Sequence, residues 1–217
     1  AKGLNAMIAE ARQKENRLNT GDAETDEETR DKIVFYRAMQ IAMQGIVNYA
    51  QNLAEKAAKL AEKESAPEKK KHFQELAGIC GRVPANPAQT FREAVNSLWL
   101  CHVGVLAENI NMAIGPGRVD QVLYPYFKTD VEQNKITVEE ALTLIGCLWL
   151  KISDNTNLVP ETAEKMWGGA GSVPAVTLGG TDKDGNDAVN DLTYLMLRAT
   201  ELLVTKDPNV NARYHSE

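Results

Sequence analysis

Cysteine is scarce in this sequence of 217 residues, which contains only three. Cys80, Cys101 and Cys147 lie far apart, without the CxxC spacing of a redox pair or the Cys/His spacing of a metal site. Each belongs to an apolar helical pattern, whereas a reactive thiol needs an exposed, electropositive setting. We therefore expect three reduced core residues in a cytoplasmic protein, and no bound metal.

Long basic runs and long apolar runs are missing as well. The formal net charge is −6 and no basic run exceeds Lys69–Lys71, so we expect no nucleic-acid partner. No apolar run has the length of a membrane span, and the N-terminal segment lacks the layout of a signal peptide. The sequence thus predicts a soluble chain. Its start at Ala1 instead of methionine predicts a processed chain or a piece of a longer one.

A series of helical patterns fills the first part of the sequence. One-sided apolar spacing predicts a helix over Leu4–Leu18. A capping box at Thr25–Glu28 starts a helix of about forty residues. Its first half should be deeply packed, and its second half, Leu53–Lys63, should lie on the surface. The apolar residues of the first half are Ile33, Val34, Phe35, Tyr36, Met39, Ile41, Met43, Ile46, Val47 and Tyr49.

Proline and two further capping boxes divide the rest of this helical part. Pro67 opens a helix through Cys80, and the prolines in Arg82–Pro87 predict an extended linker. Capping boxes at Thr90–Glu93 and Thr137–Glu140 start two more helices.

The pattern changes after Asn157. Val173–Leu178 predicts a strand that ends at Gly179-Gly180, and Asn190–Val204 predicts a helix. Residues 209–215 alternate polar and apolar side chains, which predicts a second strand. The polar face of that strand carries Asn209, Asn211, Arg213 and His215.

The stretch Ile114–Phe127 lies between two long apolar helices. Its Gly-Pro-Gly sequence at 115–117 cannot continue a helix, because proline lacks the backbone N–H and glycine has no helical preference. Arg118 and Asp120 then place charges in a segment otherwise built for burial, and buried polar groups must be paired. We expect both to satisfy backbone groups at a helix start.

Four motifs in this order resemble a known family: Arg82–Ala94, Gly115–Tyr126, Val176–Gly180 and Asp191–Leu195. Together they are similar to the pyruvate formate-lyase domain of glycyl radical enzymes, in the branch of dehydratases, decarboxylases and arylsuccinate synthases. The resemblance implies an α/β fold: a ten-stranded barrel wrapped in helices, homodimeric, in an anaerobic cytoplasm. This chain would hold an incomplete part of it, with 1–157 as a mostly helical layer and 158–217 as the first barrel strands and a helix.

The family's chemistry, as the resemblance implies it, depends on two loops. An activating partner that uses S-adenosylmethionine and an iron–sulfur cluster makes a glycyl radical, which passes to a cysteine that takes hydrogen from the substrate. Neither loop occurs in this sequence, and the cysteines lie in helical patterns. We therefore assign no catalytic residue and expect the chain alone to be inactive.

Substrate contacts can be transferred only position by position. Relatives that handle glycerol carry polar residues where this chain has Met112-Ala113, Ala170 and Pro174-Ala175. Without these hydrogen-bonding groups, the pocket cannot replace the hydrogen bonds to water that a polyol gives up on binding. The resemblance therefore implies a substrate that is an aromatic or weakly polar carboxylate. The reaction would be decarboxylation or C–C bond chemistry. The alternatives are that the alignment with these relatives is shifted by a residue or two, or that these positions pack as core.

Charged residues complete the expected substrate site. Arg213 would bind a carboxylate in fork geometry and His215 would hold or move a proton, if the family register applies. Otherwise both face solvent at a strand end. Arg118 and Asp120 are expected as a structural pair that fixes the turn below the site. Alternatives for the whole protein are a dehydratase, a C–N lyase, or a non-catalytic fragment.

Overall fold

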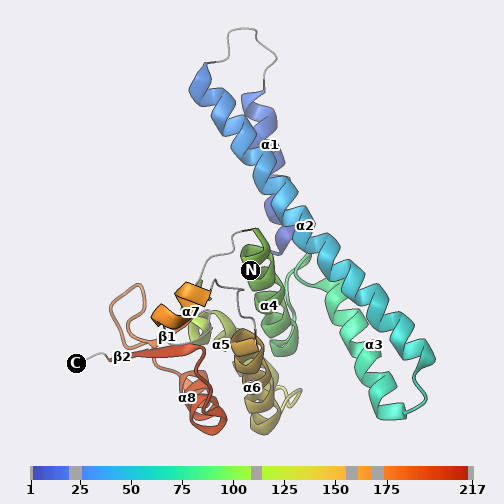
Figure 1. Ribbon diagram of the computed structural model, residues 1–217, viewed down its shortest axis with the longest axis vertical. Helices are drawn as coiled ribbons and strands as arrows, with labels where there is room; N and C mark the ends of the chain where they lie inside the picture. The colour runs from blue at the N-terminus through green and yellow to red at the C-terminus, as the bar shows by residue number, and fades with distance from the viewer. Residues whose placement is uncertain (1, 20–25, 109–113, 155–160, 168–173, 215–217) are drawn as a thin grey trace. The chain divides into compact units, whose positions relative to one another are not determined.

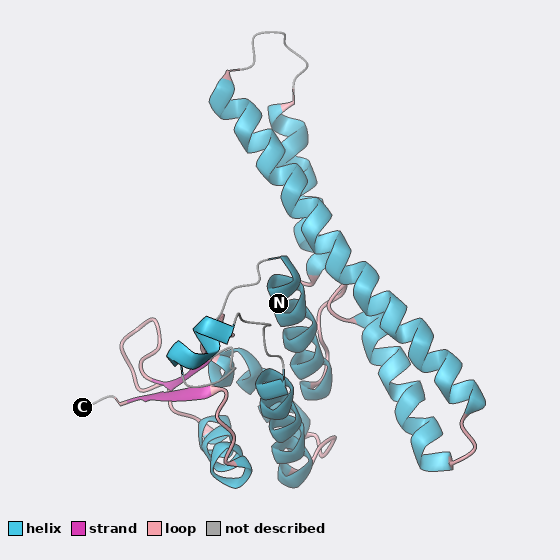
Figure 2. Cartoon of the chain, in the orientation of Figure 1, coloured by secondary structure: helices cyan, strands magenta, loops and turns pink. Residues whose placement is uncertain are grey.

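The computed structural model describes residues 2–19, 26–108, 114–154, 161–167 and 174–214. These residues are mostly helical, with one two-stranded sheet (Figure 2). They form two compact units, Ala1–Ala88 with Asn96–Gly104, and Gln89–Val95 with Val105–Glu217. Within the described ranges, no helix combines the length and the apolar character needed to cross a membrane. The expected division at residue 157 stays a prediction.

Three helices make up most of the first unit. They are α1 (Leu4–Leu18), α2 (Glu27–Lys63) and α3 (Pro67–Arg82). Helix α1 runs beside the first part of α2, and α3 beside its last part (Figure 1). The expected long helix is confirmed, but its cap is not Thr25, which lies outside the described residues. Asp26 is the N-cap, and its carboxylate accepts from the backbone N–H of Thr29 at 2.7 Å.

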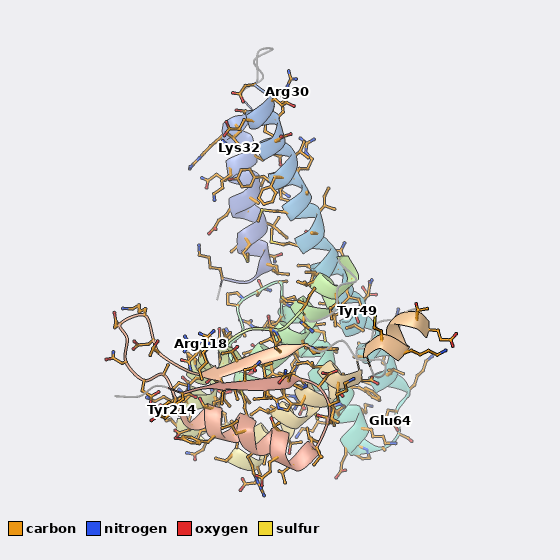
Figure 3. The ribbon with its side chains drawn as sticks, turned by 60° about the vertical axis from the view of Figure 1, so that its left-hand side comes forward. Arg30, Lys32, Tyr49, Glu64, Arg118 and Tyr214 are labelled. Carbon is orange, nitrogen blue, oxygen red and sulfur yellow. The ribbon has the colours of Figure 1, made fainter. Side chains whose placement is uncertain are left out.

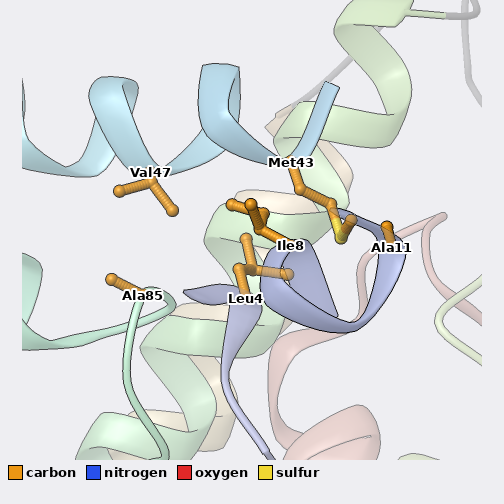
Figure 4. Close-up of a cluster of buried hydrophobic side chains, with 6 residues drawn as sticks. All are labelled: Leu4, Ile8, Ala11, Met43, Val47 and Ala85. Carbon is orange, nitrogen blue, oxygen red and sulfur yellow. The ribbon is translucent and has the colours of Figure 1, made fainter. Parts of the chain in front are cut away.

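Apolar side chains from α1 and α2 meet in a buried cluster. Its members are Leu4, Ile8, Ala11, Met43, Val47 and Ala85 (Figure 4). A second cluster joins the middle of α2 to the end of α3 through Ala50, Cys80 and Leu100. Each helix therefore buries the stripe that faces its neighbour, as helical periodicity requires.

The expected deep packing of the first half of α2 is wrong, whereas most of the second half is exposed as expected. In the first half, Val34, Phe35 and Ile41 are 62 to 68% exposed. In the second half, Ala57 and Ala61 are the buried exceptions. The reason is that α2 packs against α1 first and then α3, so one stripe is covered along its length whatever the residues on the other sides.

The second unit contains the remaining helices and both strands. The helices are α4 (Phe91–Glu108), α5 (Val119–Glu132), α6 (Val138–Asp154), α7 (Glu161–Trp167) and α8 (Asp191–Leu203), and the strands are β1 (Ala175–Gly179) and β2 (Asn209–Arg213). The middle of α4 belongs to the first unit. The capping box at Thr137 is confirmed, since Thr137 Oγ1 accepts from the N–H of Glu140 at 3.1 Å and Glu140 accepts from the N–H of Thr137 at 2.8 Å. At α4, the hydroxyl of Thr90 accepts from the N–H of Glu93 at 3.2 Å, and the carboxylate of Glu93 accepts from the N–H of Gln89 at 2.6 Å.

The two strands run parallel and side by side (Figure 1). Ala175 pairs with Asn209 and Gly179 with Arg213, so both strands end at the same edge. Val176 and Leu178 of β1 are fully buried. Both expected strands are present: β1 includes Gly179, which was expected to follow it, and β2 ends at Arg213, while Val173 and His215 lie outside the described residues.

The three cysteines differ in exposure. Cys80 is buried and Cys101 half-buried, and burial raises the pKa of both thiols. Cys147 is exposed, so the expectation that it is a core residue is wrong. Helix α6 is apolar on several sides, and Cys147 lies on a side that no described element covers.

Candidate functional site

The Gly-Pro-Gly turn at 115–117 lies just before α5 in the chain and contacts β1 in space. A Cβ on Gly115 would lie 1.8 Å from the carbonyl oxygen of Ala175, so only glycine fits where the turn crosses the strand. Gly117 has φ +78°, and its carbonyl accepts from the N–H of Thr177 at 3.0 Å. The turn therefore holds the start of α5 against β1.

Asp120, in the first turn of α5, is a fully buried carboxylate with three donors. Its Oδ2 accepts from the backbone N–H of Gly179 at 2.8 Å and from the hydroxyl of Thr193 at 2.7 Å. Its Oδ1 accepts from the N–H of Gln121 at 2.8 Å. A buried charge needs such compensation, and here it ties α5 to the end of β1 and the start of α8.

Arg118, the residue before α5, uses its guanidinium on backbone carbonyls. Nη2 donates to Gly179 at 2.7 Å and Nη1 donates to Thr181 at 2.8 Å. Its Nε is buried, with no partner among the described residues. Arg118 and Asp120 thus hold the C=O and the N–H of Gly179 respectively.

The strand end bends at two glycines. Gly179 has φ +66° and Gly180 φ +82°, conformations that L side chains rarely adopt. The N–H of Gly180 donates to the carbonyl of Arg213 at 3.1 Å, and the carbonyl of Gly180 accepts from Ala188 at 2.8 Å. The bend therefore links the ends of both strands.

Arg213 is the last residue of β2, and its side chain is exposed. Its guanidinium has no hydrogen-bond or ion-pair partner among the described residues. Its aliphatic stem lies over Gly180, because a Cβ on that glycine would be 3.2 Å from both Cβ and Cδ of Arg213. Figure 3 labels Arg118 and Tyr214, the residue after Arg213, beside the two strands. We call Arg118, Asp120, Gly179, Gly180 and Arg213 the strand-end cluster.

The structure brings three of the sequence-predicted site residues together, namely Arg118, Asp120 and Arg213. The roles assigned to them stay predictions. The other predicted site residues, Met112, Ala113, Ala170 and His215, lie outside the described residues.

Sequence reasoning did not assign Gly179, Gly180 or Thr193 to the site, although all three lie in motifs that carry the family resemblance. The Gly-Gly pair at the end of the strand was a visible signal for the two glycines. The contact of Thr193 with Asp120 spans 73 residues of sequence and could not be read from its motif.

The chemistry available to the strand-end cluster is recognition of an anion. Arg213 offers an exposed, permanently charged guanidinium with a fork of donors. Among the described residues, no group of three or more His, Cys, Asp or Glu side chains could hold a metal ion. The cluster also contains no nucleophile, so binding is the role that its residues can fill.

Comparison with known proteins identifies the family. The family described as pyruvate formate lyase-like matches residues 1–217, and the chain belongs to it. It is 35% identical over 188 residues to an isethionate sulfite-lyase of Nitratidesulfovibrio vulgaris, covering 86% of this chain and 23% of that protein. It is 31% identical over 210 residues to an indoleacetate decarboxylase of Tractidigestivibacter scatoligenes, covering 96% of this chain and 23% of the relative.

Solved structures of the family have the same fold. A glycyl radical enzyme from Archaeoglobus fulgidus superposes with a TM-score of 0.89 at 35% identity, over 98% of this chain and 27% of that one. The B12-independent glycerol dehydratase of Clostridium butyricum gives 0.90 at 28% identity, over 99% and 26%. The expected fold class is therefore confirmed: helices and two parallel strands that match part of a glycyl radical enzyme barrel fold. The chain spans about a quarter of the length of the relatives it matches.

Proposed function

We propose that this chain is a section of a glycyl radical lyase whose substrate carries an acidic group, and that Arg213 binds that group. Membership of the family implies a glycyl radical in the complete enzyme, which supplies the hydrogen abstraction that starts the reaction. The residues described here supply the barrel wall and the strand-end cluster. Their contribution is to bind and orient the substrate.

The contrast between two arginines supports this proposal. Both terminal nitrogens of Arg118 donate to backbone carbonyls, so few of its N–H donors remain for a ligand. Arg213 keeps its guanidinium exposed at the carboxyl end of a parallel strand, where ligands of α/β folds usually bind. A guanidinium there forms paired hydrogen bonds with a carboxylate or a sulfonate.

The names of the relatives point to the same class of substrate. Isethionate carries a sulfonate, and indoleacetate carries a carboxylate. Within this class we favour an aromatic or weakly polar carboxylate, in decarboxylation or C–C bond chemistry. That choice depends on apolar residues at Met112, Ala113 and Ala170.

A dehydratase or C–N lyase is the second candidate. The dehydratase is favoured by 34% identity to a (2S)-3-sulfopropanediol dehydratase of Klebsiella oxytoca and 32% identity to a trans-4-hydroxy-L-proline dehydratase of Clostridioides difficile. Both substrates also carry an acidic group, so the role of Arg213 is common to the two candidates. A substrate panel separates the candidates by product.

The partners of the complete enzyme are part of the proposal. They are an activating enzyme that uses S-adenosylmethionine and an iron–sulfur cluster, and a second copy in a homodimer, in an anaerobic cytoplasm. His215 would hold or move a proton beside the bound acid.

The first test is to read the coding DNA beyond the codon for Glu217. We expect an open frame with a cysteine loop and, near its end, an RVxGY-like glycine motif. A stop codon with no complementing chain encoded nearby would contradict the enzyme proposal and favour a non-catalytic fragment.

The second test is a substrate panel for the complete protein, activated without oxygen. Indoleacetate, isethionate and glycerol are offered separately, and products are identified by mass spectrometry. We expect turnover of an acid and none of glycerol. Turnover of glycerol alone would overturn the proposed substrate class.

A further inference from the structure

We propose that Gly180 is a positioning residue for Arg213: its missing side chain lets the arginine stem lie across the strand end, which fixes where the guanidinium meets an acidic group. This inference rests on the proposed function, because it assigns Arg213 to the substrate's acid group. It adds a residue that determines how far that guanidinium reaches.

The contact between the two residues carries the inference. A methyl group on Gly180 would lie 3.2 Å from Cβ and from Cδ of Arg213, and 3.8 Å from Nη2 of Arg118. The first two distances are tighter than ordinary carbon–carbon contacts, so one of the two residues must move. The atoms affected belong to the stem of Arg213, and displacing the stem displaces the guanidinium at its end.

The backbone at Gly180 is held too firmly to be the part that moves. The preceding residue, Gly179, is bound through its C=O by Arg118 and through its N–H by Asp120. Gly180 itself donates to the carbonyl of Arg213 and accepts from Ala188. Cβ of Arg213 is fixed by a backbone that pairs with β1, whereas Cδ belongs to an exposed side chain, so the stem beyond Cβ is the part that gives way by a change of rotamer. A side chain at position 180 would therefore push the guanidinium away from the strand end.

The chain offers a matched control in Gly185. This glycine also has a positive φ, +87° against +82° at Gly180, so alanine meets similar backbone strain at both positions. A Cβ on Gly185 meets nothing within 4 Å. The difference between G180A and G185A therefore isolates the contact with Arg213.

The experiment uses the complete protein, with its arginines labelled with nitrogen-15, titrated with methanesulfonate and, separately, with acetate. The Nε–H resonance of Arg213, assigned with R213K, reports binding. In the wild-type chain we expect this resonance to shift saturably and the Arg213 side chain to show a nuclear Overhauser effect to Gly180 Hα. In G180A the apparent dissociation constant should rise on the order of threefold to tenfold, as for a weakened charge-assisted hydrogen bond. G185A should match the wild type in binding, and both variants should keep the wild-type circular dichroism spectrum.

The outcomes separate this inference from the proposed function. Equal affinity in G180A and G185A, or no Overhauser effect between Arg213 and Gly180, overturns the positioning role while anion binding by Arg213 stands. An Overhauser effect without any shift on titration contradicts the proposed function, and the inference that rests on it falls too. Should G180A fail to fold, the wild-type protein decides alone: absence of the Overhauser effect between the Arg213 side chain and Gly180 Hα overturns the positioning role.

Discussion

Apolar side chains hold α1 against α2, whereas hydrogen bonds hold the strand-end cluster together. In the first region, small and medium apolar residues such as Ile8 and Val47 fill a stripe between two helices. In the second, Asp120 and Arg118 bind both backbone groups of Gly179. Apolar packing tolerates exchange of one apolar residue for another of similar size. A buried carboxylate with three donors has no substitute of the same kind, so the two regions should respond differently to mutation.

The largest effect is expected for Asp120→Ala. This change leaves the N–H of Gly179 and the hydroxyl of Thr193 buried without an acceptor, so stability should fall by roughly 3 kcal/mol or more. The measurement is the urea unfolding midpoint. Glu201→Ala is the control, since this exposed carboxylate has only a surface ion pair with Arg198 and should cost less than about 0.5 kcal/mol. Equal losses for the two variants would contradict the role given to Asp120.

The next effect tests the apolar region with two valines of the same helix. Val47 is 2% exposed and Val34 is 63% exposed. Val47→Ala should lower the free energy of unfolding by about 1–2 kcal/mol, and Val34→Ala by less than about 0.5 kcal/mol. Urea unfolding of both variants checks this difference. A larger loss for Val34 would mean that the first half of α2 is deeply packed after all.

A smaller effect is expected at the capping box of α6. Thr137→Ala removes the acceptor for the N–H of Glu140, which should cost about 1 kcal/mol. Thr129→Ala is the matched threonine control, because its hydroxyl only donates to the Pro125 carbonyl within α5, and it should be nearly neutral. Thermal unfolding followed by circular dichroism compares the two. If both variants unfold at the same temperature, the box does not stabilise the helix.

The smallest effect concerns the pH dependence of the cap at Asp26. The backbone N–H and the hydroxyl of Thr29 lower the pKa of this carboxyl from its ordinary value of 3.8. Because the folded pKa lies below the unfolded one, the stabilisation is present above 3.8 and is lost as pH falls through the lowered value. The difference in unfolding midpoint between the wild type and Asp26→Asn should therefore shrink as pH falls through this range. A difference that is constant with pH would contradict the charged cap.

Sequence patterns predicted the elements of both regions better than their packing. Helix α1 has the expected bounds, Leu4–Leu18, because one-sided apolar spacing is a local property. The capping box at Thr137 was equally local. The buried side of α2 could not be predicted, because Val34 and Val47 are the same residue type and only their neighbours differ.

The strand-end cluster shows the same limit from the polar side. Its residues come from three places in the chain, and Asp120 reaches Thr193 through a contact that only the fold creates. The resemblance to a family named Arg118, Asp120 and Arg213. It could not show that the guanidinium of Arg118 donates to backbone carbonyls while that of Arg213 stays exposed. That difference depends on where β1 and β2 end.

The most direct test of the account is the Michaelis constant of Arg213→Gln in the complete, activated enzyme. Glutamine keeps much of the stem and removes the charge. With an acid substrate, KM should rise roughly tenfold or more while kcat changes little, because a charge-assisted bond to the bound acid is lost. An unchanged KM for the acid substrate would contradict the claim that Arg213 binds its acidic group.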